Sequence, residues 1–133
     1  MNIGLGSKRK TILLVDENPQ ARAALRNALE AAGFTVGEAA SAREGERTAI
    51  RVKPDAVLAD LMMETIDAGG AIAAKLKEIG STIPIYIVSS ASEALVGSVG
   101  LHELGISGVF LKPADPQVVI QTLRAQLGVR LEV

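Results

Sequence analysis

Cysteine is absent from this sequence of 133 residues, and histidine occurs once. The lack of cysteine excludes disulfides, thiol catalysis and thiolate metal sites. No apolar run approaches the roughly 18 residues needed to span a bilayer, and the first ten residues lack the apolar centre of a signal peptide. Basic and acidic residues nearly balance, for a net charge of −1, so nothing indicates nucleic-acid binding. We expect a cytoplasmic protein that binds neither membranes nor nucleic acids directly.

The length and the composition are those of one globular domain with a single well-buried core. Residues 1–10 contain Gly4, Gly6 and Ser7 and are expected to form a flexible leader. Residues 11–128 are expected to form the domain itself. Residues 129–133 are too few for a domain, so they are either a tail or the start of a linker.

Short runs rich in valine, isoleucine and leucine alternate with segments of helical periodicity. The predicted strands are Thr11–Val15, Phe34–Glu38, Ala56–Ala59, Ile85–Val88 and Val109–Leu111. The predicted helices run from Asn18 to a C-cap at Gly33, from Ser41 to about Val52, over Gly70–Ile79, over Ser92–Leu104, and from Asp115 to Gly128. This alternation predicts an α/β fold with a parallel sheet covered by helices on both faces.

Four of these strands end in groups that can bind a metal or a phosphoryl oxygen. Asp16 and Glu17 follow the first strand and Asp60 the third, while Ser89 and Lys112 follow the two last strands. Because ligands of parallel α/β sheets bind outside the carboxyl ends of the strands, these groups should converge. Three carboxylates at one place would repel one another unless a cation joined them, and an all-oxygen cluster suits Mg²⁺.

Each of these residues also has an ordinary structural explanation. An aspartate or a serine at a strand end often caps the next helix, as Asp16 and Ser89 could here, and Lys112 could be a surface lysine. The convergence of several such groups on one sheet edge favours a site over these separate explanations. The single histidine, His102, lies far from the acidic residues in sequence and is interpreted as a surface residue, not a phosphodonor.

Together and in this order, these segments resemble the response-regulator receiver domains of two-component signalling. The resemblance covers Lys10 to Leu127 and depends on Val15-Asp16-Glu17, on Leu58 to Met63 around Asp60, on Pro84 to Ser89, and on Lys112-Pro113. It implies a flavodoxin-like, doubly wound fold with a five-stranded parallel sheet of order 2-1-3-4-5.

The resemblance also implies a function and a role for each residue. Asp60 would accept a phosphoryl group from a sensor histidine kinase or a phosphotransfer protein, assisted by Ser89 and Lys112. Mg²⁺ would be held by Asp16, Glu17, Asp60 and the backbone carbonyl of Met62. The domain would then be a switch in a phosphorelay rather than an enzyme in its own right. Because Gly97 and Gly100 weaken the predicted fourth helix that follows Ser89, we also expect a second copy or an output domain to bind through the fourth helix, the fifth strand and the fifth helix.

The sequence departs from the family pattern at several positions. Glu64 replaces the usual proline four residues after the phosphoacceptor, and Ala68 replaces a glycine often found in that loop. Val109 stands where an aromatic residue is usual, and its neighbour Phe110 should point to the opposite face of the strand. The loop after Asp60 and the readout by an aromatic side chain are therefore expected to differ.

Two other functions compete with the phosphorylated switch. Glu64 adds a carboxylate that could repel a phosphodonor, so the alternative is a receiver-like domain that acts only by protein–protein contact. A phosphatase or a nucleotide-binding enzyme ranks last, since Met62 stands where an aspartyl phosphatase has its second aspartate. The glycine-rich phosphate loop is also missing after the first strand.

Overall fold

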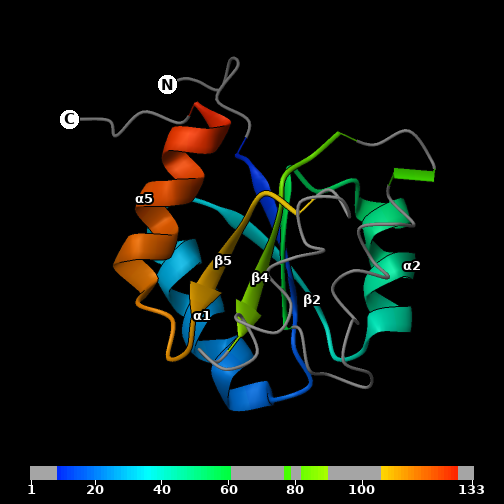
Figure 1. Cartoon of the computed structure of the whole chain (residues 1–133), viewed down its shortest axis with the longest axis horizontal. Coiled ribbons are helices and arrows are strands. Elements are labelled where there is room, and N and C mark those ends of the chain that lie inside the picture. The colour runs from blue at the N-terminus through cyan, green and yellow to red at the C-terminus, as the bar shows by residue number, and fades with distance from the viewer. Residues whose placement is uncertain (1–8, 61–76, 79–81, 90–105, 129–133) are drawn as a thin grey trace.

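The computed structural model describes residues 9–60, 77–78, 82–89 and 106–128. Within these ranges the chain forms a five-stranded parallel sheet of order β2-β1-β3-β4-β5 (Figure 1). The strands are β1 (Thr11–Val15), β2 (Thr35–Ala39), β3 (Ala56–Asp60), β4 (Ile85–Ser89) and β5 (Gly108–Leu111). The predicted fold class and strand order are confirmed.

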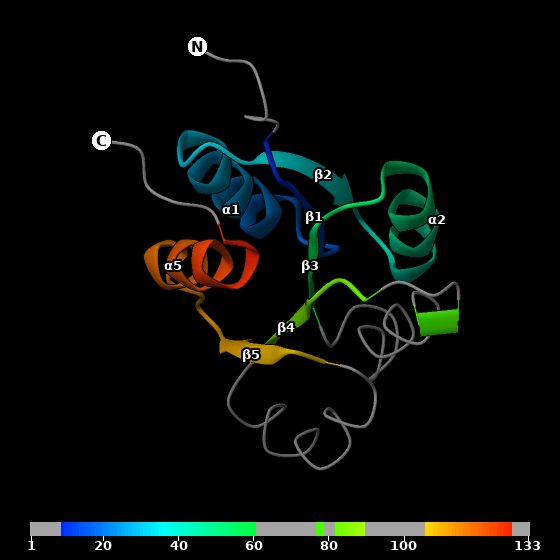
Figure 2. The ribbon, with the colours of Figure 1, turned by 90° about the horizontal axis from the view of Figure 1, so that it is seen from above.

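Within the described ranges, three helices pack on the two faces of this sheet. They are α1 (Pro19–Ala31), α2 (Ala42–Val52) and α5 (Pro116–Leu127). Figure 2 shows α1 and α5 together on one face and α2 on the other. The predicted helices Gly70–Ile79 and Ser92–Leu104 lie outside the described residues, apart from the helical pair Lys77 and Glu78. None of the described helices is long and apolar enough to cross a membrane.

The alternation of side chains along the strands divides the core into two clusters. On the α2 face, Leu13, Val15, Val57, Ala59, Ile85 and Ile87 pack with Ala49. On the α1 and α5 face, larger residues meet: Ile12, Leu14, Leu58 and Tyr86 pack with Leu29, Phe34, Val119, Ile120 and Leu123. Since both faces are covered, the residues of β3 and β4 are buried along their whole length.

The helix starts follow from capping residues that the sequence indicated. The Asn18 side chain accepts hydrogen bonds from the N–H groups of Gln20 and Ala21, and that of Asp115 accepts one from Gln117. In both helices proline occupies the first position, where no N–H is needed. Each cap directs its helix away from the carboxyl end of a strand, and thereby places the loop before it at that edge.

Several predicted element ends differ from the structure by one residue, including the end of β2, which is at Ala39, and the start of β5, which is at Gly108. Helix α1 has its C-cap at Ala32, and Gly33 follows with φ +100° rather than capping the helix itself. The N–H of Phe34 still donates to the carbonyl of Leu29, so Phe34 belongs to the helix termination and β2 begins one residue later, at Thr35. Strands β3 and β4 extend one residue further than predicted, to Asp60 and Ser89, because the strand pairing continues through these polar residues.

Candidate functional site

Asp60 and Lys112 form an ion pair at the carboxyl edge of the sheet. The Nζ atom of Lys112 lies 3.0 Å from Oδ2 of Asp60. Asp60 ends β3 and its side chain is 7% exposed, whereas that of Lys112, just after β5, is 39% exposed. The backbone N–H of Lys112 donates to the carbonyl of Ser89, which continues the pairing of β5 with β4 and brings the lysine to the site. A cation thus contacts a nearly buried carboxylate.

Asp16 joins this pair from the neighbouring strand β1. Its backbone N–H donates to the carbonyl of Ala39, and its Oδ1 accepts from the N–H of Asn18 at 2.9 Å. Burial raises the pKa of the Asp16 carboxyl, and the negative charge of Asp60 raises it further, against the hydrogen bond from Asn18 and the charges of Lys112 and Arg22. The two carboxylates are therefore close enough to repel each other, as the sequence predicted.

An open pocket of about 690 Å³ lies over these groups. Its polar lining consists of Asp16, Glu17, Asn18, Asp60 and Lys112. The remaining lining is apolar and comes from α1, from Val88 and from the segment Pro113–Pro116. Glu17 is an exposed residue that lines this pocket. Four of the predicted site residues, from β1, β3 and β5, therefore face one volume large enough for a phosphoryl donor group.

Ser89 is placed differently from the other predicted residues. It ends β4 beside Leu111 of β5 and is completely buried. Val88, which pairs with Asp60, lines the pocket, whereas Ser89 does not. Adjacent side chains of a strand point to opposite faces of the sheet, so Ser89 lies on the α2 side, away from this pocket. The sequence correctly predicted that Ser89 lies at the carboxyl edge of the sheet, but it did not predict on which face of the sheet the side chain lies.

The model of the response regulator receiver domain matches residues 12–124, most of the chain. The chain belongs to this receiver domain family. It is 30% identical over 127 residues to the transcriptional regulatory protein PrrA of Mycobacterium tuberculosis, a match that covers 96% of this chain and 53% of PrrA. With the phosphate regulon transcriptional regulatory protein PhoB of Pseudomonas aeruginosa it shares 32% identity over 120 residues, 89% of this chain and 52% of PhoB.

Solved structures show the same fold. A CheY-like receiver domain protein of Methanospirillum hungatei has a TM-score of 0.82 at 21% identity and covers 91% of this chain and 95% of its own. A two-component response regulator of Clostridium difficile has a TM-score of 0.81 at 19% identity and covers 91% and 98%. The receiver domain described here spans about half the length of the curated relatives that it matches.

The acidic residues of this receiver domain match a hard divalent cation in their chemistry. Asp16 and Asp60 are oxygen donors whose mutual repulsion a cation would relieve, and Glu17 lines the same pocket. Within the described ranges, however, no group of three or more histidine, cysteine, aspartate or glutamate side chains is arranged to hold a metal ion. Met62, the predicted carbonyl ligand, lies outside those ranges. The Mg²⁺ site stays a prediction.

Val109, where an aromatic residue is usual in the family, and its neighbour Phe110 pack on opposite faces of β5. Val109 packs against the core on the α2 side, and Phe110 packs with Tyr86 on the other, their ring centres 5.3 Å apart. The predicted opposite orientation of these two neighbours is confirmed. Glu64, Ala68 and His102 lie outside the described residues.

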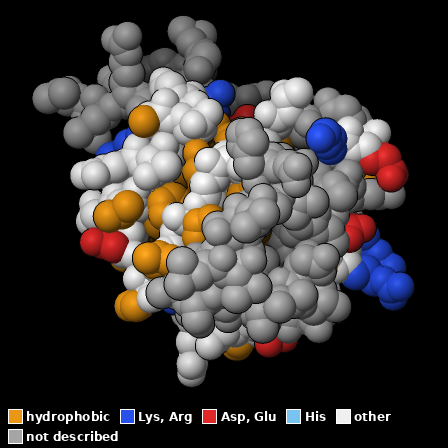
Figure 3. All heavy atoms as spheres, viewed as in Figure 1, with side chains coloured by type: hydrophobic (Ala, Val, Ile, Leu, Met, Phe, Trp, Pro, Cys, Tyr) orange, Lys and Arg blue, Asp and Glu red, His pale blue; other side chains and the backbone are white. Residues whose placement is uncertain are grey.

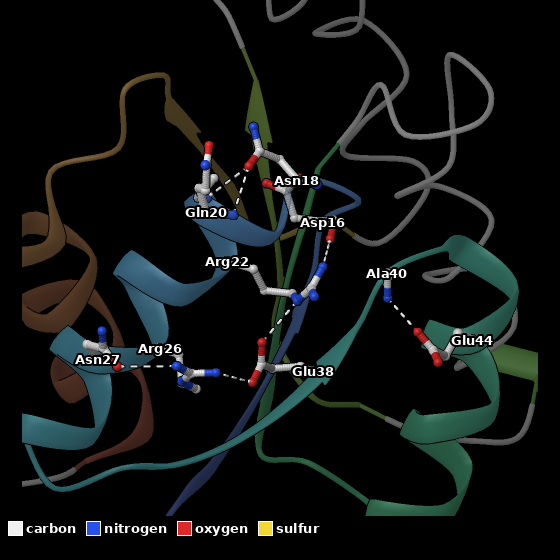
Figure 4. Close-up of polar contacts among 10 residues, drawn as sticks. Asp16, Asn18, Gln20, Arg22, Arg26, Asn27, Glu38, Ala40 and Glu44 are labelled. Carbon is white, nitrogen blue, oxygen red and sulfur yellow. Dashed lines mark hydrogen bonds and ion pairs between the residues drawn. The ribbon is translucent and has the colours of Figure 1, made fainter.

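Sequence reasoning missed one residue beside the site, Arg22 of α1. Its Nη1 donates to the backbone carbonyl of Asp16, and its Nε donates to Glu38 of β2 at 2.9 Å (Figure 4). An arginine on an amphipathic helix is usually solvated, so the helical pattern gave no reason to select it. Only the parallel pairing of β1 with β2 brings Glu38 within its reach.

Proposed function

We propose that this receiver domain is a signalling switch controlled by phosphorylation, in which Asp60 accepts a phosphoryl group from a sensor histidine kinase or a phosphotransfer protein. The ion pair between Lys112 and Asp60, at the edge of a pocket that also contains Asp16, carries this proposal. The resemblance to response regulators and the membership of their receiver family support it.

The reaction needs a nucleophile and a way to neutralise charge. An oxygen of the Asp60 carboxylate attacks phosphorus, the bond from phosphorus to the donor breaks, and the donor leaves with the bonding electrons. Lys112 then stabilises the negative charge of the transferring group, because its ammonium already lies at the reacting carboxylate. Asp16, Glu17 and Asp60 would hold Mg²⁺, which when bound supplies further positive charge beside the phosphoryl oxygens.

Incubation with acetyl phosphate and Mg²⁺, followed by intact-mass analysis, tests the proposal. We expect the mass of one added phosphoryl group, lost again in alkali because an acyl phosphate is labile. Asp60→Asn should gain nothing. Asp55→Asn, just before the start of the same strand, should gain as much as the unaltered protein, since its amide oxygen can still accept from the N–H of Thr11.

No gain in the unaltered protein would favour the alternative, a receiver-like domain that acts by protein–protein contact alone. A gain in Asp60→Asn equal to that of the unaltered protein would place the phosphoryl group on another residue. Omitting Mg²⁺ separates the two parts of the proposal, because phosphorylation that proceeds equally well in its absence contradicts the metal requirement and leaves the role of Asp60 standing.

We further propose that β5 and α5 belong to the surface that reads out the modification, through a second copy of the domain or an output domain. These elements expose Leu111 (53%) and Val118 (48%). Figure 3 shows hydrophobic side chains over this part of the molecule. If the domain dimerises here when phosphorylated, Leu111→Ser and Val118→Ser should weaken dimerisation measured by sedimentation, while Ile50→Ser on α2 should not.

A further inference from the structure

Arg22 connects α1, β2 and the loop that carries Asp16. Its guanidinium lies between Asp16 and Glu38, with Nη1 directed at the Asp16 carbonyl and Nε at the Glu38 carboxylate (Figure 4). The side chain is 17% exposed, well below the usual value for an arginine on a surface helix. Because the N–H groups of a guanidinium form a rigid planar fork, two partners in different directions fix both its position and its orientation.

The contacts of Asp16 show what this fork stabilises. The Asp16 N–H donates to Ala39 of β2, its carbonyl accepts from Arg22, and its Oδ1 accepts from the N–H of Asn18. The backbone of Asp16 is thus held on both sides of its Cα atom. Arg22 provides the contact to the carbonyl, which precedes Glu17 and the turn into α1. Arg22 therefore holds the backbone from which the Asp16 carboxylate extends.

Arg22 also lines a cavity together with the carboxylates of Asp16 and Asp60. A small cavity of about 20 Å³ is lined by Arg22, Asp16 and Asp60, and otherwise by apolar side chains of β1, α1, β3 and β4. Charges interact more strongly in such apolar surroundings than in open solvent. The positive charge of Arg22 lies at the backbone carbonyl of Asp16, whereas that of Lys112, just after β5, contacts the carboxylate of Asp60.

We propose that Arg22 is a positioning residue for Asp16. The ion pair with Glu38 fixes the Arg22 guanidinium, which holds the Asp16 carbonyl and thereby orients the Asp16 carboxylate for cation binding. This inference rests on the proposed function for its consequence in phosphoryl transfer. Arg22 contacts neither a phosphoryl group nor a metal in this scheme, and it acts through Asp16 alone.

Arg26 provides a matched control, one turn further along α1. Its Nη1 contacts the other oxygen of Glu38 at 2.8 Å, and its Nη2 contacts Asn27. Removal of either arginine deprives Glu38 of one ion pair. Only the removal of Arg22 also takes a hydrogen bond from Asp16, so the difference between the two variants isolates the contact to the site.

The experiment compares Arg22→Gln, Arg26→Gln and Arg22→Lys in three measurements. They are the amide chemical shifts and hydrogen exchange of Asp16 and Asn18 without metal, the affinity for Mg²⁺ by titration, and the rate of phosphorylation by acetyl phosphate. Since loss of an outer partner of a metal ligand typically weakens binding 10- to 100-fold, we expect about a 10-fold lower Mg²⁺ affinity in Arg22→Gln. Arg26→Gln should stay within about twofold of the unaltered protein by the same reasoning.

Arg22→Lys should recover part of the loss, because an ammonium can donate to the carbonyl or to Glu38 but cannot reproduce the fork. This variant also carries the test if Arg22→Gln does not fold. Equal Mg²⁺ affinities and equal Asp16 amide shifts in the variants of Arg22 and Arg26 would overturn the inference.

The two proposals fail in distinguishable ways. If the unaltered protein neither binds Mg²⁺ nor gains a phosphoryl group, the proposed function fails. The positioning of Asp16 is then decided by the metal-free measurements alone. Selective loss of protection at the Asp16 N–H in Arg22→Gln supports the inference, and equal protection in Arg22→Gln and Arg26→Gln overturns it.

Discussion

Asp16 and Lys112 approach Asp60 from opposite sides of β3, and the protein holds them in different ways. Asp16 follows β1, a strand buried at four of its five positions, and is fixed through its N–H, its carbonyl and its carboxylate. Lys112 follows β5, an edge strand without a fully buried residue, and its side chain contacts Asp60 from a position that is 39% exposed.

This difference fits two different tasks. Groups that bind a small hard cation work best when their geometry is set before binding, because little order is then lost on binding. A cation that must move from the free carboxylate to its phosphorylated form needs room to adjust. We infer that the acidic part of the site is preorganised by β1, β2 and α1, whereas the basic part can follow the chemistry.

The largest effect that tests this comparison concerns packing. Leu29 of α1 is fully buried, so Leu29→Ala should lower the free energy of unfolding by about 2–5 kcal/mol. Leu111 of β5 is 53% exposed, and Leu111→Ala should change it by less than about 0.5 kcal/mol. Urea denaturation measures both. Similar losses of unfolding free energy in the two variants would show that β5 is as firmly packed as α1, which contradicts the proposed difference between the two sides of the site.

The next effect concerns the cation. Loss of one group that stabilises the charge of a transition state typically slows the step by at least about 10²-fold, so Lys112→Ala should accept a phosphoryl group from acetyl phosphate about 100-fold more slowly. Its Mg²⁺ affinity should be retained, since no proposed metal ligand is lost. Lys77→Ala, which removes an exposed lysine of the same charge, is the control. Equal rates in the two variants would remove Lys112 from the reaction.

A smaller effect concerns the two helix caps beside the site. Asn18→Ala and Asp115→Ala each remove a capping side chain and should cost about 1 kcal/mol of unfolding free energy. The Asn18 cap accepts two N–H groups beside Asp16, whereas the Asp115 cap accepts one at the start of α5. Only Asn18→Ala should therefore weaken Mg²⁺ binding. A loss of affinity in Asp115→Ala of the same size would mean that both halves of the site are equally coupled to their helices.

The positions of the elements and the polar residues at the strand ends could be predicted because the determining interactions are local, whereas the strand order was implied by the resemblance to receiver domains. Proline after Asn18 or Asp115 starts a helix, and four apolar residues before Asp16 form a buried strand, whatever the rest of the chain does. The convergence of Asp16, Asp60 and Lys112 then follows from the handedness of parallel β-α units.

The remaining features depend on registers that no local pattern encodes. Pairing of β1 with β2 aligns Leu14 with Glu38 and brings Glu38 to Arg22. Likewise, Ser89 points away from the pocket because β4 aligns Val88 with Asp60; a shift of one residue would exchange the two faces. The polar character of a strand end is thus predictable, but the face on which its last side chain lies is not.

The smallest predicted effect is electrostatic. It concerns the pH dependence of stability that Asp16 and Glu38 contribute, and the two contributions have opposite signs. Burial, with repulsion from Asp60, raises the pKa of Asp16 above its ordinary value of 3.8, so folding favours the protonated form. This contribution to stability is complete below pH 3.8 and is lost as pH rises through the raised pKa. Glu38 behaves oppositely: the hydrogen bond from Arg26 lowers its pKa below 4.5, and its contribution is lost as pH falls through that lowered pKa.

Without metal at pH 7, Asp16→Asn should therefore unfold at a slightly higher urea concentration than the unaltered protein, because the amide oxygen still accepts from the Asn18 N–H without carrying charge. The gain should shrink as pH falls towards 3.8. Glu38→Gln should be less stable at pH 7, with its deficit shrinking below pH 4.5. Saturating Mg²⁺ should reverse the order of Asp16→Asn and the unaltered protein, since only the latter retains the full ligand set. A less stable Asp16→Asn at pH 7 without metal would show that the Asp16 carboxylate is stabilised, not strained, by the contacts that hold it.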